Sequence, residues 1–92
     1  MISKNSYCTN NIVLSPITTK EALITAIHLW NTNRIEAIAT YGEINKWNVT
    51  QIADMSGLFA NQITFNDNIN EWDVGNVTDM SEMFYGASAF NQ

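Results

Sequence analysis

Apolar residues in the N-terminal half of the chain recur every three or four positions. Between residues 19 and 31 this spacing places Leu23 and Trp30 on one face of a helix. Thr18 followed by Glu21 fits a capping box at the start of that helix. The pattern therefore predicts an amphipathic helix with one apolar side.

A second, shorter helix should follow almost directly. Asn33 is a favourable first residue with Glu36 three positions on, and Gly42 suits a left-handed stop. Ile35 and Tyr41 are expected to line its apolar face. Together the two segments predict a helical hairpin that must bury its apolar side against something else.

The C-terminal half repeats itself. Aligning residues 41–65 with 66–90, without gaps, gives identical residues at nine positions, mostly apolar ones. A 25-residue period is typical of leucine-rich-repeat-like solenoids, in which one unit cannot cover its own core but a stacked copy can. The identical pairs are Ile44/Ile69, Asn45/Asn70, Trp47/Trp72, Val49/Val74, Asp54/Asp79, Met55/Met80, Ser56/Ser81, Phe59/Phe84 and Phe65/Phe90.

Each repeat is expected to hold one strand and one short helical turn. Asp79 can cap such a turn, with Glu82 completing a capping box and Gly86 ending it. Asn61 stands where Gly86 does, and asparagine also tolerates the left-handed conformation. Equivalent side chains should then stack, Trp47 over Trp72, Met55 over Met80 and Phe59 over Phe84.

These patterns predict an α+β fold, namely a short leucine-rich-repeat-like solenoid of about two coils, closed at its N-terminal end by the helical hairpin. The expected divisions are a polar tail at 1–16, a helical cap at 17–42, and two repeats with the start of a third at 43–92. The predicted repeat core is Ile44, Trp47, Val49, Met55, Leu58, Phe59, Phe65, Ile69, Trp72, Val74, Met80, Met83 and Phe84.

Charge narrows the classes of partner. Only 14% of residues are charged, and the net charge of −5 divides into +1 over residues 1–40 and −6 over residues 41–92. An acidic repeat half argues against nucleic acid, because affinity for a phosphate backbone comes from Lys and Arg. No stretch is long and apolar enough to span a membrane, and the N-terminal sequence contains neither a signal-peptide core nor a lipobox.

Candidate chemistry is sparse. His28 lies beside the apolar stripe of its helix, and Cys8 is the only cysteine, so neither a catalytic residue, a metal site nor a bound cofactor is expected. Asp54 and Asp79 could offer oxygen ligands to calcium, but their spacing matches no calcium loop and helix capping explains them. A polar binding surface is expected instead at Lys46, Asn48, Asn70, Glu71 and Asp73.

The repeat sequence FNDNINEWDVGNVTDMSEMFYGASAFNQ, residues 65–92, resembles that of the BspA-like leucine-rich-repeat surface proteins, known from mycoplasma lipoproteins and other bacterial surface proteins. With the preceding EALITAIHLWNTNRIEAIATYGEINKW, the resemblance covers about residues 18–92. Thr50 and Gly75 depart from the usual serine. The resemblance implies adhesion or protein–protein recognition at a cell surface or outside the cell, without catalysis.

Two functions are therefore weighed. The first is a non-enzymatic repeat module that binds a protein partner, and the second is a structural spacer or decayed fragment with no binding activity of its own. An enzyme ranks third, because no acid–base pair, activated nucleophile or phosphate loop can be assembled. Phe90 begins a third unit, which predicts a fragment of a longer array and self-association through an open repeat edge.

Overall fold

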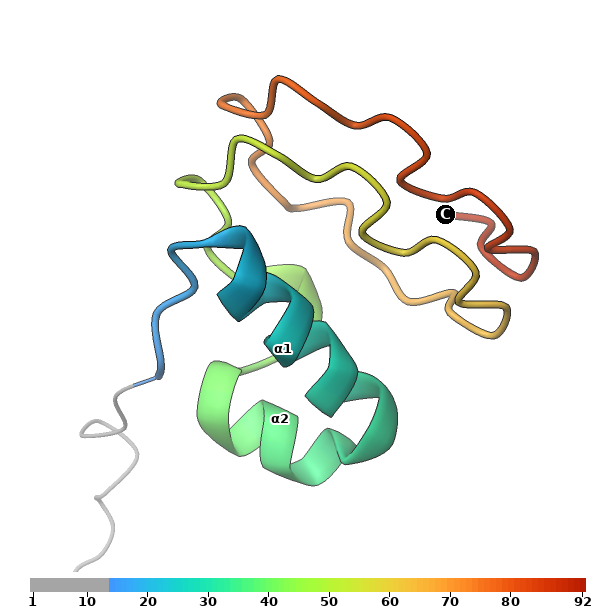
Figure 1. Ribbon diagram of the computed structural model, residues 1–92. Helices are drawn as coiled ribbons and strands as arrows, with labels where there is room; N and C mark the ends of the chain where they lie inside the picture. The colour runs from blue at the N-terminus through green and yellow to red at the C-terminus, as the bar shows by residue number, and fades with distance from the viewer. Residues whose placement is uncertain (1–13) are drawn as a thin grey trace, which may run out of the picture.

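The computed structural model describes residues 14–92, and its regular elements are helical (Figure 1). Helix α1 spans Lys20–Thr32, helix α2 spans Arg34–Tyr41, and a 3-10 helix, η2, spans Ile44–Lys46. The rest of the chain runs back and forth as two long, irregular loops, one for each repeat, beside the helices. Residues 1–13 of the predicted tail lie outside the described residues, and the division at 17–42 and 43–92 stays a prediction.

The predicted α+β, strand-based leucine-rich-repeat solenoid is wrong. Within residues 14–92 no segment forms a strand, and the single β-bridge joins Asp54 and Asp79 in parallel. The cause is local: the amide of Leu58 donates to the Met55 carbonyl at 3.2 Å, and that of Trp72 to the Ile69 carbonyl at 3.1 Å. Because such tight turns occupy every second amide, the backbone cannot pair continuously with a neighbour, as strands do. The protein is a small helical domain with turn-rich repeats.

The first helix begins one residue later than its sequence pattern indicates. Thr19, not Thr18, is the N-cap, and its hydroxyl accepts a hydrogen bond from the Ala22 amide at 3.1 Å. The predicted capping box at Thr18 and Glu21 is therefore wrong, although helix and cap type are as expected. Adjacent threonines are chemically equivalent caps, so the sequence alone does not distinguish between them.

The second helix follows its prediction at both ends. The Asn33 side chain accepts from the Glu36 amide at 3.2 Å, and Gly42 ends α2 with φ of 85°. One residue departs: Ile35, expected on the apolar face, is 85% exposed, whereas Ala37 is buried. Position 35 lies in the first turn of α2, on the side that faces away from the single core cluster.

The helical turns expected at the start of each repeat's second half do not form. The Asp79 carboxylate accepts from the Ser81 amide, two residues on, at 2.9 Å, and Asp54 does the same with Ser56 at 2.8 Å. Glu82 then adopts φ of 55°, which no right-handed helix contains. The aspartates therefore close Asx turns rather than cap helices.

One core joins the helices to both repeats. The rings of Trp30 and Trp47 meet edge to face at 6.0 Å, and the Trp72 ring stacks on Trp47 at 6.3 Å with 19° between the planes. The indole N–H of Trp72 donates to the Ile44 carbonyl at 2.7 Å in a buried position. The predicted stacking of Trp47 over Trp72 is confirmed, and α1 completes the series on its inner side.

Polar contacts fix α1 along the first repeat. The Lys20 ammonium lies 3.1 Å from the Ser56 hydroxyl and 3.4 Å from the Asp54 carboxylate. At the other end of the helix, the Asn31 amide donates to the Gln62 side chain at 2.9 Å. Helix α1 thus covers one side of the segment from residue 54 to 62, and residues 79–85 of the second repeat lie on its other side (Figure 1).

Left-handed residues recur at matched positions of the two repeats. Asn61 has φ of 63° and its counterpart Gly86 has φ of 73°, as the sequence predicts. Gly57 has φ of 65°, but its counterpart is Glu82 at 55°. A glutamate therefore holds a conformation that costs a residue with a Cβ about 1–2 kcal/mol.

Glu82→Gly is expected to raise the free energy of unfolding by about 0.5–1 kcal/mol, because relief of left-handed strain exceeds the added entropy of an unfolded glycine. Gly57→Ala is the matched control and should lower stability, because alanine is strained at a positive φ. No atom lies within 4 Å of the new Cβ, so neither a clash nor a packing contact changes that sign. Urea denaturation of both variants measures the two signs. A Glu82→Gly variant less stable than the parent would contradict the strain assignment.

Candidate functional site

From residue 55 to 61 of the first repeat, the two repeats are joined by a row of backbone hydrogen bonds that run in one direction. Every second amide of the first repeat donates to a carbonyl of the second, in parallel order, at 2.7–2.9 Å. The intervening amides bond within their own repeat. The four bonds of this row run from Met55 to Asp79, Gly57 to Ser81, Phe59 to Met83 and Asn61 to Tyr85. A fifth bond precedes the row and runs the opposite way, from the Thr78 amide to the Ala53 carbonyl at 2.8 Å.

The second repeat offers the same row of amides to no partner. Met80, Glu82, Phe84 and Gly86 are the counterparts of the four donors, 25 residues on, and their N–H groups find no acceptor among residues 14–92. We call this row of four amides, with the side chains of Met80, Phe84 and Phe90, the outer edge. Unpaired amides along an extended backbone are a ready template for a further polypeptide segment.

Two aromatic pairs stack beside this row. Phe59 and Phe65 pack at 4.2 Å, and Phe84 and Phe90 at 4.2 Å form a second pair on top of them. Ring separations between the pairs are 5.4 Å for Phe59 to Phe84 and 5.7 Å for Phe65 to Phe90, nearly parallel in both cases. The predicted Phe59/Phe84 stacking is confirmed. The inner pair is buried and the outer pair half-buried, so the outer pair is an apolar platform on the outer edge.

The residues of the predicted repeat core differ in how deeply they are buried. Met80 departs from its prediction: it is 45% exposed, whereas its counterpart Met55 is fully buried. The second repeat covers Met55, and no described residue covers Met80 in the same way. Ile69, Val74 and Phe84 are half-buried, and the buried members are Ile44, Trp47, Val49, Met55, Leu58, Phe59, Phe65, Trp72 and Met83.

Of the predicted polar surface, the structure brings Lys46 and Glu71 together. Their charged groups lie 2.7 Å apart in an exposed ion pair. Asn48 accepts from the amide of Thr50. Asp73 likewise accepts from the amide two residues on, at Gly75, so both turn back on their own loops. The side chain of Asn70 makes no hydrogen bond within the described part of the chain.

The counterpart of Asn70 in the first repeat, Asn45, accepts a hydrogen bond from the neighbouring repeat. The Asn45 carbonyl oxygen accepts from the Glu71 amide at 3.0 Å, one repeat further along. By the same geometry Asn70 is placed to accept an amide from a segment on the outer edge. The sequence does not predict a binding role for Asn45 or for the four amides. Its only indication of this contact is that asparagine occurs at the same position in both repeats.

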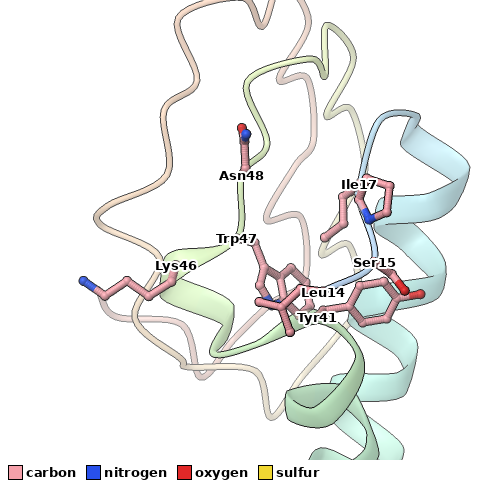
Figure 2. Close-up of a pocket in the computed structure, with 8 residues that line it drawn as sticks. Leu14, Ser15, Ile17, Tyr41, Lys46, Trp47 and Asn48 are labelled. Atoms are coloured by element: carbon pink, nitrogen blue, oxygen red, sulfur yellow. The ribbon is translucent and has the colours of Figure 1, made fainter. Parts of the chain in front are cut away.

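A shallow depression of about 210 Å³ lies elsewhere, between the chain at 14–17, Tyr41 and residues 46–48 (Figure 2). Trp47 and Leu14 supply apolar surface. The Lys46 side chain extends away from the tryptophan in Figure 2, and its ammonium is engaged by Glu71. The depression therefore offers an apolar contact, without an acid–base pair.

Other candidate chemistry does not assemble. His28 is exposed on α1, and Cys8 lies outside the described residues. Within residues 14–92 no three His, Cys, Asp or Glu side chains gather as metal ligands would. None of the helices in that part of the chain is long and apolar enough to cross a membrane.

Hydrogen bonds from the serine two residues on lower the pKa of both repeated aspartates. Donation from the Ser56 hydroxyl and amide holds the pKa of Asp54 below its usual range, with Lys20 adding a smaller effect. The pKa of Asp79 is lowered in the same way by the Ser81 hydroxyl and amide. Both carboxylates are exposed, so the consequence for stability is modest.

Lowering the pH is expected to destabilise the fold in the acid range. A carboxylate whose folded pKa is depressed stabilises fully above the unfolded aspartate pKa, about 3.9, and this contribution is lost as pH falls through the folded pKa. The double variant Asp54→Asn, Asp79→Asn should flatten the dependence of the melting temperature on pH below about 4. Thermal melts from pH 7 to pH 2 measure it, with Glu43→Gln as control, because the Glu43 side chain makes no capping hydrogen bond. Parent and double variant falling in parallel would contradict this role.

Residues 36–92 match a protein family described as "Mycoplasma protein of unknown function, DUF285". No curated protein and no solved structure matches the chain. The match covers α2 from Glu36 and both repeats, including the whole outer edge. It confirms the resemblance to the mycoplasma and BspA-like repeat proteins at the level of the family, and it does not extend to a leucine-rich-repeat class.

Proposed function

This chain belongs to the DUF285 family of mycoplasma proteins, and from that premise we propose that it is a non-enzymatic module for protein–protein recognition that binds a polypeptide along its outer edge. The observation that carries the proposal is the row of four amides, at Met80, Glu82, Phe84 and Gly86, that have no acceptor in the part of the chain that the structure describes. The same row in the first repeat is fully paired, so the backbone geometry is already suited to receive a segment.

Side chains support the same surface. Met80 and the half-buried pair Phe84 and Phe90 place apolar area beside the amides. Main-chain hydrogen bonds supply affinity in this mode of recognition, and neighbouring side-chain pockets supply selectivity. A catalytic role gains no support from the described residues, which offer no assembled acid–base pair or nucleophile.

Selection of displayed linear peptides tests the proposal without a known partner. The parent should enrich peptides that Met80→Lys no longer binds, because a charge replaces apolar contact at the centre of the edge. Ile24→Lys is the matched control, since Ile24 on α1 is 48% exposed against 45% for Met80. Circular dichroism establishes that both variants remain folded.

Two results would overturn the proposal. Peptides enriched equally on the parent and on folded Met80→Lys would place recognition elsewhere on the molecule. The absence of any enriched peptide on the parent would favour the alternative, a structural spacer without binding activity of its own.

A further inference from the structure

We infer that the outer edge accepts one class of partner, a segment of the same 25-residue pattern whose carbonyl side is uncovered, and that intact copies of this chain do not pair with one another through it. This inference rests on the proposed function and specifies its partner. It follows from the direction of the hydrogen bonds and from what covers each side of the repeats.

From residue 79 to 85 the outer edge is a donor surface, and the Thr78 carbonyl just before it is the counterpart of the Ala53 carbonyl, which accepts from the Thr78 amide. In the segment from residue 79 to 85, every carbonyl already accepts a hydrogen bond. Four carbonyls accept from the first repeat, namely those of Asp79, Ser81, Met83 and Tyr85. The other three, those of Met80, Glu82 and Phe84, accept from amides three residues on in their own repeat.

Two such edges cannot pair with each other. If two copies met edge to edge, the amides of Met80 and Phe84 in one copy would face amides in the other. Each would lose water without gaining an acceptor, and an unpaired buried donor is unfavourable.

Head-to-tail stacking of whole copies is blocked by α1. The carbonyl side of the first repeat is the counterpart of the side on which Asp79 and Ser81 accept, and α1 lies over it. Lys20 and Asn31 hold the helix there through Ser56 and Gln62. Within residues 14–92 the first repeat of an intact copy therefore offers no uncovered row of carbonyls like the row from Asp79 to Tyr85.

The inner interface specifies what does fit. A partner must run parallel to the edge and present carbonyls at every second residue, as the second repeat does to the first. It should place two aromatic side chains, six residues apart, on Phe84 and Phe90, as those residues lie on Phe59 and Phe65. It should also bring an amide to Asn70, as Glu71 brings one to Asn45. A repeat of this same pattern meets all three requirements.

The probe for this inference is a synthetic, fluorescently labelled peptide of residues 66–92, which carries the acceptor side without α1. We expect saturable binding to the intact chain by fluorescence anisotropy, about tenfold weaker to Met80→Lys and unchanged to Ile24→Lys. A peptide of the same composition in scrambled order should not bind. In parallel, sedimentation of the intact chain across a dilution series should show a monomer.

Each contrary result is distinct. A dimer that Met80→Lys abolishes would show that intact copies pair through the edge, and would overturn the inference. Failure of the 66–92 peptide to bind, with selected peptides still binding in a Met80-dependent way, would also overturn it and leave the proposed function standing. Failure of both kinds of peptide would remove the proposed function as well.

Discussion

Trp72→Ala is expected to lower the free energy of unfolding by about 3–5 kcal/mol, the usual loss for a buried aromatic side chain. Trp72 is 7% exposed and lies at the centre of the aromatic core. Its ring stacks on Trp47 and lies 6.0 Å from Phe59. Removal therefore leaves a cavity between the repeats that neither neighbour can fill from its own position.

The indole N–H of Trp72 makes a second contribution to stability. It donates to the Ile44 carbonyl in a buried position, so Trp72→Phe separates the hydrogen bond from the ring. We expect Trp72→Phe to cost about 1–2 kcal/mol, less than Trp72→Ala, because most of the apolar area is kept. Urea denaturation followed by circular dichroism measures both variants.

Tyr85→Ala is the control, since Tyr85 is an aromatic residue of the same repeat with 66% of its surface exposed. It should change stability by less than about 0.5 kcal/mol. A Trp72→Ala variant no less stable than Tyr85→Ala would show that the two repeats do not share one core.

Met55→Ala and Met80→Ala form the second prediction, in which one repeat position gives two different results. Met55 is fully buried beneath the second repeat, whereas Met80 is 45% exposed on the outer edge. Met55→Ala should lower the free energy of unfolding by about 2–5 kcal/mol, and Met80→Ala by less than about 1 kcal/mol. The contrast arises from position in the stack, because the residue type is the same.

Thermal and urea unfolding of the two variants measure the difference. Loss of stability that is equal in both would mean that Met80 is covered as Met55 is, which would contradict an open outer edge. If Met80→Ala keeps the stability of the parent and weakens binding of the 66–92 peptide, the residue acts in recognition rather than in folding.

Local sequence determined the helices well. The side chain of Asn33 and the backbone freedom of Gly42 set both ends of α2, because each effect depends on a few adjacent residues. The choice between Thr18 and Thr19 at the start of α1 was beyond the sequence, since both can accept the same bond. In the structure Thr19 is the N-cap, and the next residue, Lys20, contacts Ser56 of the first repeat.

The repeat period predicted which residues stack and misjudged the backbone between them. Trp47 over Trp72 and Phe59 over Phe84 follow directly from identical residues 25 positions apart. An alternation of apolar and polar residues is compatible with a strand and also with a chain of tight turns. The carbonyl of Met55 accepting from Leu58 within one repeat decides for turns, and no apolar pattern reports such a bond.

The candidate site was only partly visible in the sequence. The sequence predicts that Lys46 and Glu71 belong to a polar binding surface, and in the structure they form an ion pair with each other. The outer edge was foreseen only as an open repeat edge near Phe90. Its four amides could not be named, because an amide's availability depends on whether another segment lies against it.

The sequence by itself determined the repeat, its phase, the side chains that stack and the two helices that precede it, because these depend on residue type and spacing along the chain. Only the tertiary structure decided that Met55 and Met80 differ, and that the amides of Met80, Glu82, Phe84 and Gly86 find no acceptor among residues 14–92. Identical residues acquire different roles when one has a neighbour on both sides and the other on one. That asymmetry is created by stacking and by α1, so it exists only in three dimensions.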